Sequence, residues 1–151
     1  MAQGEDESQK NTINKYRKLS QQNEMLGDKK EASRFLNEIG MIEWENKHFE
    51  KAIGYFKRSL SLNEAIKNTT GIAGLCNNLG MLYSDIHQYK KSKEYFQKAL
   101  DIRMQAGDRE SIISSLINLS VVLNNLKEYE ESAQKLKKAL ELAQEKNDIV
   151  Q

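Results

Sequence analysis

The sequence predicts an all-α protein built from repeated pairs of helices, and three observations support this fold class. First, the chain matches itself at an offset of forty residues without any gap, so that Ile39, Leu79 and Leu119 stand at equivalent places. Second, short polar junctions separate the repeating segments. Third, the 151 residues include no proline that would interrupt a helix. Self-similarity at a fixed period of this size is typical of a stacked array, in which each unit buries its apolar face against its neighbours.

The middle copy, residues 77–100, defines the repeating unit. Further equivalent positions hold residues of similar character, namely Phe49, Tyr89 and Tyr129, then Phe56, Phe96 and Leu136, then Leu60, Leu100 and Leu140. We expect helices over residues 29–46, 49–67, 70–86, 89–106, 109–126 and 129–146. An opening helix over residues 10–26 aligns with the second helix of a repeat and brings the expected number to about seven.

The short connections between the expected helices divide the chain into repeats. Gly27-Asp28 matches Gly107-Asp108 at the connections, where Gly ends one helix and Asp caps the next. We therefore expect a disordered polar tail (1–9), a half-repeat helix (10–28), three full repeats (29–68, 69–108 and 109–148) and a final segment (149–151). That final segment is either the start of a missing repeat or a tail.

Small residues recur where two helices are expected to approach closely. Gly40, Gly80 and Ser120 share one register. Two further registers of small residues in the second helices hold Ala52, Ser92 and Ser132, and Ser59, Ala99 and Ala139. Because large side chains fill the space beside small ones, these positions are predicted to lie in tightly packed helix contacts.

The middle copy carries a recognisable motif. It reads Cys76-x2-Leu79-Gly80-x2-Tyr83 and, in the second helix, Ser92-x3-Phe96-x2-Ala99. This spacing resembles the tetratricopeptide repeat (TPR), with Cys in place of the first Trp, while Glu43 departs from the pattern where an aromatic residue is expected. The forty-residue step is longer than the usual unit of about 34 residues, so the resemblance is to a forty-residue-period subclass. The resemblance implies that the two helices of each pair are antiparallel and that the pairs stack into a right-handed superhelical solenoid.

Composition and charge narrow the possible function. The chain is 38% apolar and 30% charged, with a net charge of +1, so it has no general positive charge to attract nucleic acid or an anionic membrane. It lacks an apolar run near eighteen residues, and its first residues are polar. We therefore expect a cytoplasmic protein that binds neither nucleic acid nor membrane.

No constellation of residues points to catalysis or to a cofactor. The single cysteine, Cys76, falls on a core position of the repeat and is predicted to be a buried, inert thiol. His48 and His87 lie in turns about one repeat apart, too far to share a metal ion. Neither a Gly-rich phosphate loop nor a nucleophile motif is present. The protein is expected to be no enzyme and to bind no cofactor or metal.

The TPR resemblance implies that the first helix of each repeat lines a concave groove that binds a partner. The groove residues so implied are Arg34, Asn37, Met41 and Trp44, then Asn77, Asn78, Met81 and Asp85, then Ser114, Ile117, Asn118, Val121 and Asn125. Asn side chains both donate and accept, so Asn78 and Asn118 could hold a ligand backbone, or could equally bond between helices. Trp44 is either an anchor for a partner or a cover for the preceding helix, and the methionines are either an adaptable floor or core.

The sequence thus predicts a non-catalytic module that binds a peptide or protein segment in the concave groove. Two alternatives stay open. The chain could be a regulatory sensor segment of a larger signalling protein. It could also be a structural module that self-associates weakly through the helix over 129–146, since that helix does not read as the polar cap with which solenoids normally end.

Overall fold

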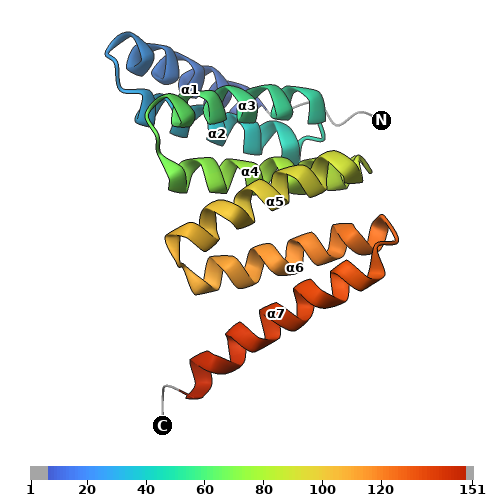
Figure 1. Ribbon diagram of the computed structural model, residues 1–151. Helices are drawn as coiled ribbons and strands as arrows, with labels where there is room; N and C mark the ends of the chain where they lie inside the picture. The colour runs from blue at the N-terminus through green and yellow to red at the C-terminus, as the bar shows by residue number, and fades with distance from the viewer. Residues whose placement is uncertain (1–6, 149–151) are drawn as a thin grey trace. The chain divides into compact units, whose positions relative to one another are not determined.

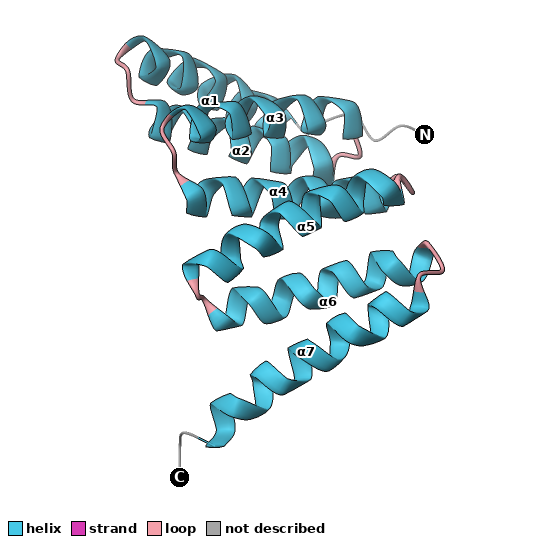
Figure 2. Ribbon diagram, in the orientation of Figure 1, coloured by secondary structure: helices cyan, strands magenta, loops and turns pink. Residues whose placement is uncertain are grey.

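Seven helices make up the part of the chain that the computed structural model describes, residues 7–148. They are α1 (Glu7–Met25), α2 (Lys29–Glu45), α3 (Phe49–Ala65), α4 (Thr69–Asp85), α5 (Tyr89–Ala106), α6 (Arg109–Asn125) and α7 (Tyr129–Asp148). Only short turns join them, and this described range contains no strand (Figures 1 and 2). The all-α fold class and the seven helices expected from the sequence are confirmed.

The predicted helix boundaries from residue 29 onward agree with the structure to within two residues. The first helix differs more, because α1 begins at Glu7, whereas residues 7–9 were expected to belong to a disordered tail. An acidic side chain in the first turn favours a helix start, and the Thr12 hydroxyl donates to the Ser8 carbonyl at 2.9 Å. The rest of the expected tail (1–6) and the final segment (149–151) lie outside the described residues.

The chain forms two compact units that divide within α4. Residues up to Leu75 form the first unit, with α1, α2, α3 and the start of α4, and residues from Cys76 form the second, with the rest of α4 and α5 to α7. In the first unit α2 packs against both α1 and α3. In the second, α6 packs against both α5 and α7. The candidate site is therefore described within each unit separately.

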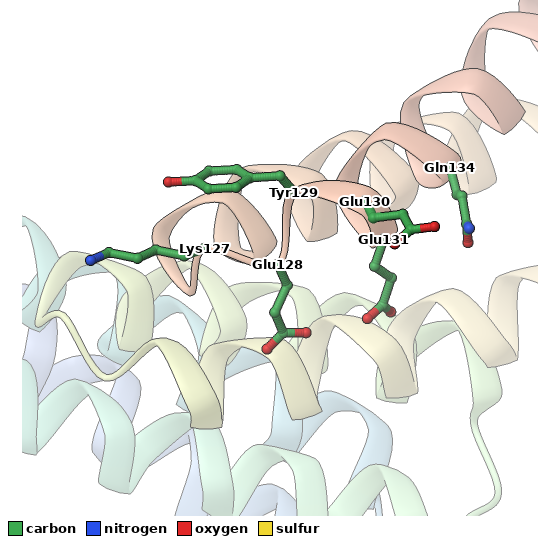
Figure 3. A pocket seen from close by; sticks show the side chains of 6 residues that line it. All are labelled: Lys127, Glu128, Tyr129, Glu130, Glu131 and Gln134. Carbon is green, nitrogen blue, oxygen red and sulfur yellow. The ribbon is translucent and has the colours of Figure 1, made fainter.

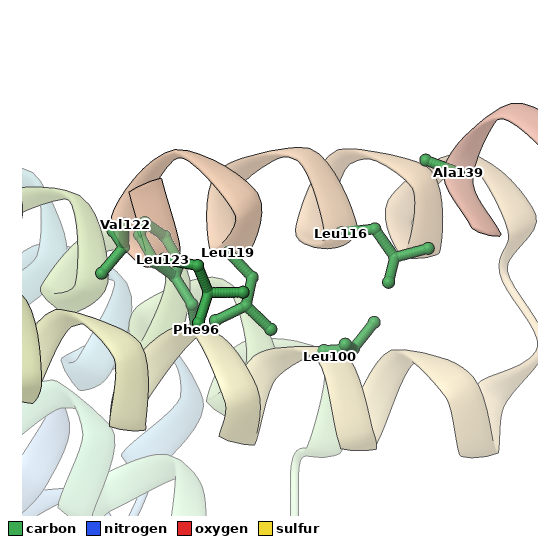
Figure 4. Close-up of a cluster of buried hydrophobic side chains, with 7 residues drawn as sticks. All are labelled: Phe96, Leu100, Leu116, Leu119, Val122, Leu123 and Ala139. Carbon is green, nitrogen blue, oxygen red and sulfur yellow. The ribbon is translucent and has the colours of Figure 1, made fainter. Parts of the chain in front are cut away.

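The core of the second unit lies between α5 and α6. Phe96 and Leu100 point from α5 toward the leucines of α6, as Figure 4 shows. The buried cluster consists of Phe96, Leu100, Leu116, Leu119, Val122, Leu123 and Ala139. Each of these side chains removes apolar surface from water, a gain of about 25 cal/mol per Å², so the helix pairs are stable only when stacked.

The small residues mark the closest helix contacts, as predicted. A Cβ atom added at Gly40 would lie 2.6 Å from the Phe56 ring, and one at Gly80 would lie 2.7 Å from the Phe96 ring. The glycines thus make room for an aromatic ring at equivalent places in the two units.

Serines in these contacts also donate to the neighbouring helix. The Ser92 hydroxyl donates to the Gly80 carbonyl at 2.6 Å, and the Ser132 hydroxyl donates to the Ser120 carbonyl at 3.0 Å. Both hydroxyls are buried, so these bonds satisfy groups that would otherwise be costly to desolvate. The register of Ser92 and Ser132 therefore requires a small side chain. Where that side chain is a serine, the facing helix also provides a carbonyl that accepts its hydrogen bond.

We expect Gly80→Ala to destabilise the second unit by about 1–3 kcal/mol, because the added methyl overlaps the Phe96 ring. The chemical denaturation midpoint measures this. The matched control is Gly54→Ala, at an exposed glycine of α3 whose added Cβ meets nothing within 4 Å. That change should be neutral or stabilising by up to about 1 kcal/mol, since Ala is the better helix former. Equal midpoints for the two variants would contradict the close-contact explanation.

Every connection between helices contains a residue in the left-handed backbone region. Gly27 and Gly107 have φ of 81° and 75°, and Lys67, at the equivalent position between them, has φ of 54°. The turns within the helix pairs place Lys47, His87 and Lys127 at φ of 62°, 61° and 63°. A left-handed residue reverses the chain just after a helix, and non-glycine residues adopt it only at some cost.

Glu43, the residue that departs from the repeat pattern, is buried with a partner. Its side chain is 3% exposed, and its Oε2 lies 2.7 Å from Nδ1 of His48, the residue just before α3. Tyr83 and Leu123 are buried at the equivalent positions. His48 lies in the turn before α3, as predicted, and its ring also supplies the polar partner that a buried carboxylate requires.

His48→Ala should destabilise the first unit by about 1–3 kcal/mol, because it leaves the Glu43 carboxylate buried without this partner. Glu43→Leu, which installs the residue of the third repeat, should be near neutral or stabilising, since a buried polar pair is often replaceable by a hydrophobic side chain. In the double variant the cost of removing His48 should disappear. Denaturation midpoints of the four proteins give the coupling, and additive effects would show that the two side chains do not depend on each other.

Candidate functional site

Two helices of the second unit, α4 and α6, bring the predicted binding residues together. The Asn118 side-chain amide donates to Oδ1 of Asn77 at 3.0 Å. The Asn77 amide in turn lies 3.4 Å from Sδ of Met81, one turn along α4. Side-chain contacts thus fix the register between the two helices on the face where both were expected to bind a partner.

Exposed apolar side chains surround this amide pair. Met81 is 42% exposed, Ile117 45% and Val121 53%. The α4–α6 face, as we call it, consists of Asn77, Asn78, Met81 and Asp85 from α4 and Ser114, Ile117, Asn118, Val121 and Asn125 from α6. Exposed large apolar side chains grouped around polar ones are a common feature of surfaces that bind another molecule.

Two further polar groups of the face bond within their own helix. Ser114 donates to the Glu110 carbonyl at 3.1 Å, and the Asn125 amide donates to the Val121 carbonyl at 3.0 Å. Asp85 is the one charged residue of the set. The face is therefore almost neutral, and a partner would meet apolar side chains and amides rather than an ionic clamp.

In the first unit, the predicted binding residues Arg34, Asn37 and Met41 either contact neighbouring side chains or are half-buried. The Arg34 guanidinium bonds to the Glu31 carboxylate, with Nε at 2.9 Å from Oε1, and it also lies over the Phe35 ring, 4.3 Å from its centroid. The hydrogen bond raises the pKa of Arg34 and lowers the pKa of Glu31. Met41 and Asn37 are half-buried. This unit thus offers less exposed apolar surface at the predicted positions than the α4–α6 face does.

Trp44 packs within its own helix pair. Its ring meets the Phe56 ring of α3 edge-on, with 6.1 Å between centroids, and the residue is half-buried. The sequence left two interpretations open, a partner anchor or a cover for the preceding helix, and the structure adds a contact with the following helix, α3. The reason is local, because Gly40 brings Phe56 close to α2 and so places its ring within reach of Trp44.

An acidic recess of about 570 Å³ at the start of α7 is a second surface feature. It is lined by Lys127, Glu128, Tyr129, Glu130, Glu131 and Gln134 (Figure 3). Lys93 of α5 reaches the carboxylates of both Glu128 and Glu131, at 3.2 Å in the second case. The hydrogen bond from Lys93 lowers the pKa of Glu128, and that of Lys93 is raised. These carboxylates are part of an ion-pair network between helices, so they are unsuited to hold a cation.

Cys76 and His87 lie at the places that the sequence predicted, a buried position of the repeat and a turn. Cys76 is a buried thiol, and Nδ1 of His87 lies 2.8 Å from the Tyr89 hydroxyl. Within residues 7–148 no three His, Cys, Asp or Glu side chains gather as a metal site would require. No helix in that range is both long and apolar enough to cross a membrane.

Comparison with known proteins identifies the fold family. A family model described as the tetratricopeptide repeat matches residues 31–105 and again residues 71–145, which together cover most of the chain. The chain belongs to the tetratricopeptide repeat family. The two matches begin forty residues apart (71 − 31 = 40), the same step by which the TPR sequence matches itself. A comparison with curated proteins finds no match.

Solved structures show the same TPR fold at low sequence identity. BtubC from P. vanneervenii is 21% identical with a TM-score of 0.81, covering 89% of this chain and 56% of its own. The apo form of RapI is also 21% identical, with a TM-score of 0.80 over 89% of this chain and 38% of its own. The TPR domain of Arabidopsis FLU is 19% identical, with a TM-score of 0.70 over 77% and 98% of the two chains. The TPR chain thus spans little more than half of BtubC and less than half of RapI.

Asn118→Ala should destabilise the second unit by about 0.5–1.5 kcal/mol, because it removes the hydrogen bond between α4 and α6. Asn125→Ala is the matched control, since that amide bonds only to the preceding turn of its own helix among the contacts found, and it should change stability by less than about 0.5 kcal/mol. Thermal unfolding of wild type, Asn77→Ala, Asn118→Ala, Asn77→Ala/Asn118→Ala and the Asn125→Ala control measures the effect. If the double variant lost as much stability as the two single variants together, the Asn77 and Asn118 side chains would not stabilise each other.

Proposed function

We propose that this TPR protein is a non-catalytic interaction module that binds a peptide or protein segment along the α4–α6 face, as part of the concave groove that the family pattern implies. The observation that carries the proposal is the group of exposed Met81, Ile117 and Val121 around the Asn77–Asn118 pair. TPR proteins generally mediate protein–protein interaction, so the family supports the general class, and the residues of this face carry the more specific part.

The chemistry of the face favours an uncharged, partly apolar segment. Met81 has an unbranched, polarisable side chain that adapts to different apolar partners. Val121 lies one repeat away at the equivalent position and is exposed to a similar degree. Burying these side chains on binding would release apolar surface from water, the main favourable term in most protein associations. A partner with apolar side chains spaced along a strand or helix matches this arrangement.

The amides add directional contacts. Asn118 uses one of its donors on Asn77, which holds its side chain in one orientation in the absence of a partner. An Asn side chain has two donor hydrogens and two acceptor lone pairs, so the pair retains capacity toward a ligand backbone. A preordered amide loses less conformational entropy on binding than a free one, which makes this pair a suitable contact for main-chain groups.

Three further sequence predictions belong with this proposal. They are the repeat boundaries (29–68, 69–108 and 109–148), membership of a forty-residue-period subclass, and a cytoplasmic location. The forty-residue internal offset supports the first two. The net charge of +1 and the near-neutral face support a partner that is neither a nucleic acid nor a membrane.

The test uses peptides selected against the protein itself. A display library of random 12-residue peptides is selected for binding, and the enriched peptide is titrated by fluorescence anisotropy against wild type, Met81→Glu and Val121→Glu. Each variant should weaken binding at least tenfold, because a carboxylate would be buried against apolar groups. Both positions are already exposed, so circular dichroism should show unchanged helix content.

The matched control is Met104→Glu, an equally drastic change at a side chain of α5 that is 55% exposed and lines a recess with Leu100 and Leu142, outside the set of residues that defines the α4–α6 face. It should bind the selected peptide like wild type. The proposal fails if the enriched peptides bind both face variants as tightly as wild type, or if Met104→Glu loses as much affinity as they do.

A further inference from the structure

An apolar recess of about 330 Å³ lies between three helices of the second unit, α5, α6 and α7. Leu100 and Leu116, which point toward each other from α5 and α6 in Figure 4, are buried at its floor. The apolar side chains that line it are Leu100, Met104, Ile112, Leu116 and Leu142. We call this feature the α5–α7 recess. Pockets that bind small molecules have volumes of roughly 300–1,000 Å³, so the recess is large enough for a small ligand.

The recess is on the side of α7 that faces away from the exposed leucines of that helix. Each residue turns a helix by about 100°, so Lys135, Lys138 and Leu142 share one side of α7. Leu136 and Leu140 lie on the opposite side and do not line the recess. A helix packed on those two leucines would therefore leave the recess open, because α5, α6 and α7 alone form its walls.

The first unit shows how the same position is closed. Its helices α1, α2 and α3 correspond to α5, α6 and α7 at an offset of two repeats, and this offset aligns Glu24 with Met104 and Arg58 with Lys138. The Arg58 guanidinium of α3 lies 2.7 Å from Oε1 of Glu24 in α1. In the first unit an ion pair thus bridges the two outer helices of the three.

The second unit retains the cation of this pair and lacks the carboxylate. Met104 and Lys138 both line the recess, and among residues 7–145, whose side chains the structure describes, Lys138 forms no ion pair. The intervening repeat has Glu64 and Lys98 at the aligned sequence positions, so opposite charges occur there twice and Met104 breaks the pattern. The methionine makes the recess apolar and leaves a lysine at its edge.

The floor of the recess differs in the same sense. Leu100 and Ile112 stand where the first unit has Ser20 and Ala32, two repeats earlier. Larger apolar side chains at the floor increase the apolar surface that a ligand can cover, and burying such surface is the main favourable term in association.

A second lysine strengthens the positive character of the edge. Among the described residues that line the recess, Lys135 and Lys138 are charged and none is acidic. Nζ of Lys135 lies 3.9 Å from Oε1 of Glu131, and Lys93 donates to the other oxygen of that carboxylate at 3.2 Å. Because Glu131 is shared between two lysines, it neutralises Lys135 only in part. The edge therefore favours an anionic group.

We propose that the α5–α7 recess binds a small molecule with a carboxylate head and an unbranched apolar chain, that is, a medium-chain fatty acid. The carboxylate would lie beside Lys138, as the Glu24 carboxylate lies beside Arg58 in the first unit. The chain would replace water on the apolar floor. A two-turn helix occupies on the order of 1,000 Å³, so a recess of about 330 Å³ suits a chain rather than a helix of another protein.

Methyl NMR on the whole chain tests the site with octanoate as the probe. Carbon-13 labelling of Met and Ile methyl groups gives Met104 and Ile112 as reporters in the recess, and Met81 and Ile117 as reporters on the α4–α6 face. Octanoate should shift the first two along one saturating curve and leave the other two unchanged. A ligand of this size in a half-open pocket should saturate it by about 5 mM, so the lack of saturable shifts in the recess up to that concentration overturns the proposal.

Two related probes separate the chain from the head. Each methylene that no longer enters the recess should weaken binding by up to about fourfold, so hexanoate should bind roughly three- to fifteenfold more weakly than octanoate. Lys138→Gln should weaken octanoate about two- to fivefold and leave 1-octanol, which has the same chain and no charge, unaffected. Equal affinities for hexanoate and octanoate would contradict the proposed chain site, and equal losses for octanoate and 1-octanol would contradict the proposed head contact.

Met104→Glu installs the residue that the first two repeats have at this place. Its carboxylate can pair with Lys138 as Glu24 pairs with Arg58, and it repels the head of the ligand. Octanoate binding, followed at the Ile112 methyl group, should therefore weaken by about tenfold or more.

Met81→Glu is the matched control, the same substitution at a methionine of the α4–α6 face with similar exposure, 42% against 55% for Met104. It should bind octanoate like wild type, and circular dichroism should show unchanged helix content for both variants. Equal affinities of the two variants for octanoate, or equal losses, would overturn the assignment. The peptide selected for the α4–α6 face should not displace octanoate, so this proposal can fail or succeed independently of that one.

An acidic segment of another protein is the rival occupant, and it gives a different result. A capped peptide with the sequence Leu-Leu-Glu-Leu-Leu supplies the same carboxylate and apolar groups on a main chain. If this peptide shifts the Met104 and Ile112 methyl groups with a lower dissociation constant than octanoate, the recess is a docking site for protein and the fatty-acid assignment is wrong. If octanoate binds more tightly and displaces the peptide, the assignment is supported.

Discussion

The close approach of paired helices at a glycine is the contact on which the rest of the structure depends. Gly40 and Gly80 leave the space that the Phe56 and Phe96 rings fill, and an added methyl group would overlap those rings. In the second unit, the Gly80 contact brings α4 and α5 together, and the Phe96 ring also packs in the cluster with the leucines of α6. The spacing of the helices in that unit depends on this steric requirement.

Buried polar side chains in the helix contacts each have a hydrogen-bond partner close by, as Ser92 and Glu43 show. Serine replaces alanine where a hydroxyl can donate to the carbonyl of the facing helix, as Ser92 does to Gly80. Glu43 shows the opposite case, a charged residue at a core position, which the protein tolerates because His48 lies 2.7 Å from its carboxylate. Buried polar atoms in this protein are acceptable where the local turn or helix supplies a partner.

Exposed apolar side chains occur at two kinds of repeat position. On the α4–α6 face, Met81 and Val121 are exposed at equivalent positions of the second and third repeats, while Met41, their equivalent in the first repeat, is half-buried. In α7, Leu136 and Leu140 are exposed at positions whose equivalents in α3 and α5 are buried. The exposure of a repeat position therefore depends on the neighbouring helices as well as on the register.

The sequence by itself determined the helices, their number and the positions of the close contacts. These features repeat every forty residues, so the recurrence of small and large side chains at equivalent positions reveals them in the sequence alone. Which side chains contact each other within those positions was decided by the tertiary structure alone. The Asn77–Asn118 bond, the Trp44–Phe56 contact and the Glu31 carboxylate that holds Arg34 each depend on the angle at which one side chain leaves its helix. Spacing along the chain fixes the helix face on which a residue lies, but the neighbour it meets depends on how the helices pack, and only the folded protein supplies that packing.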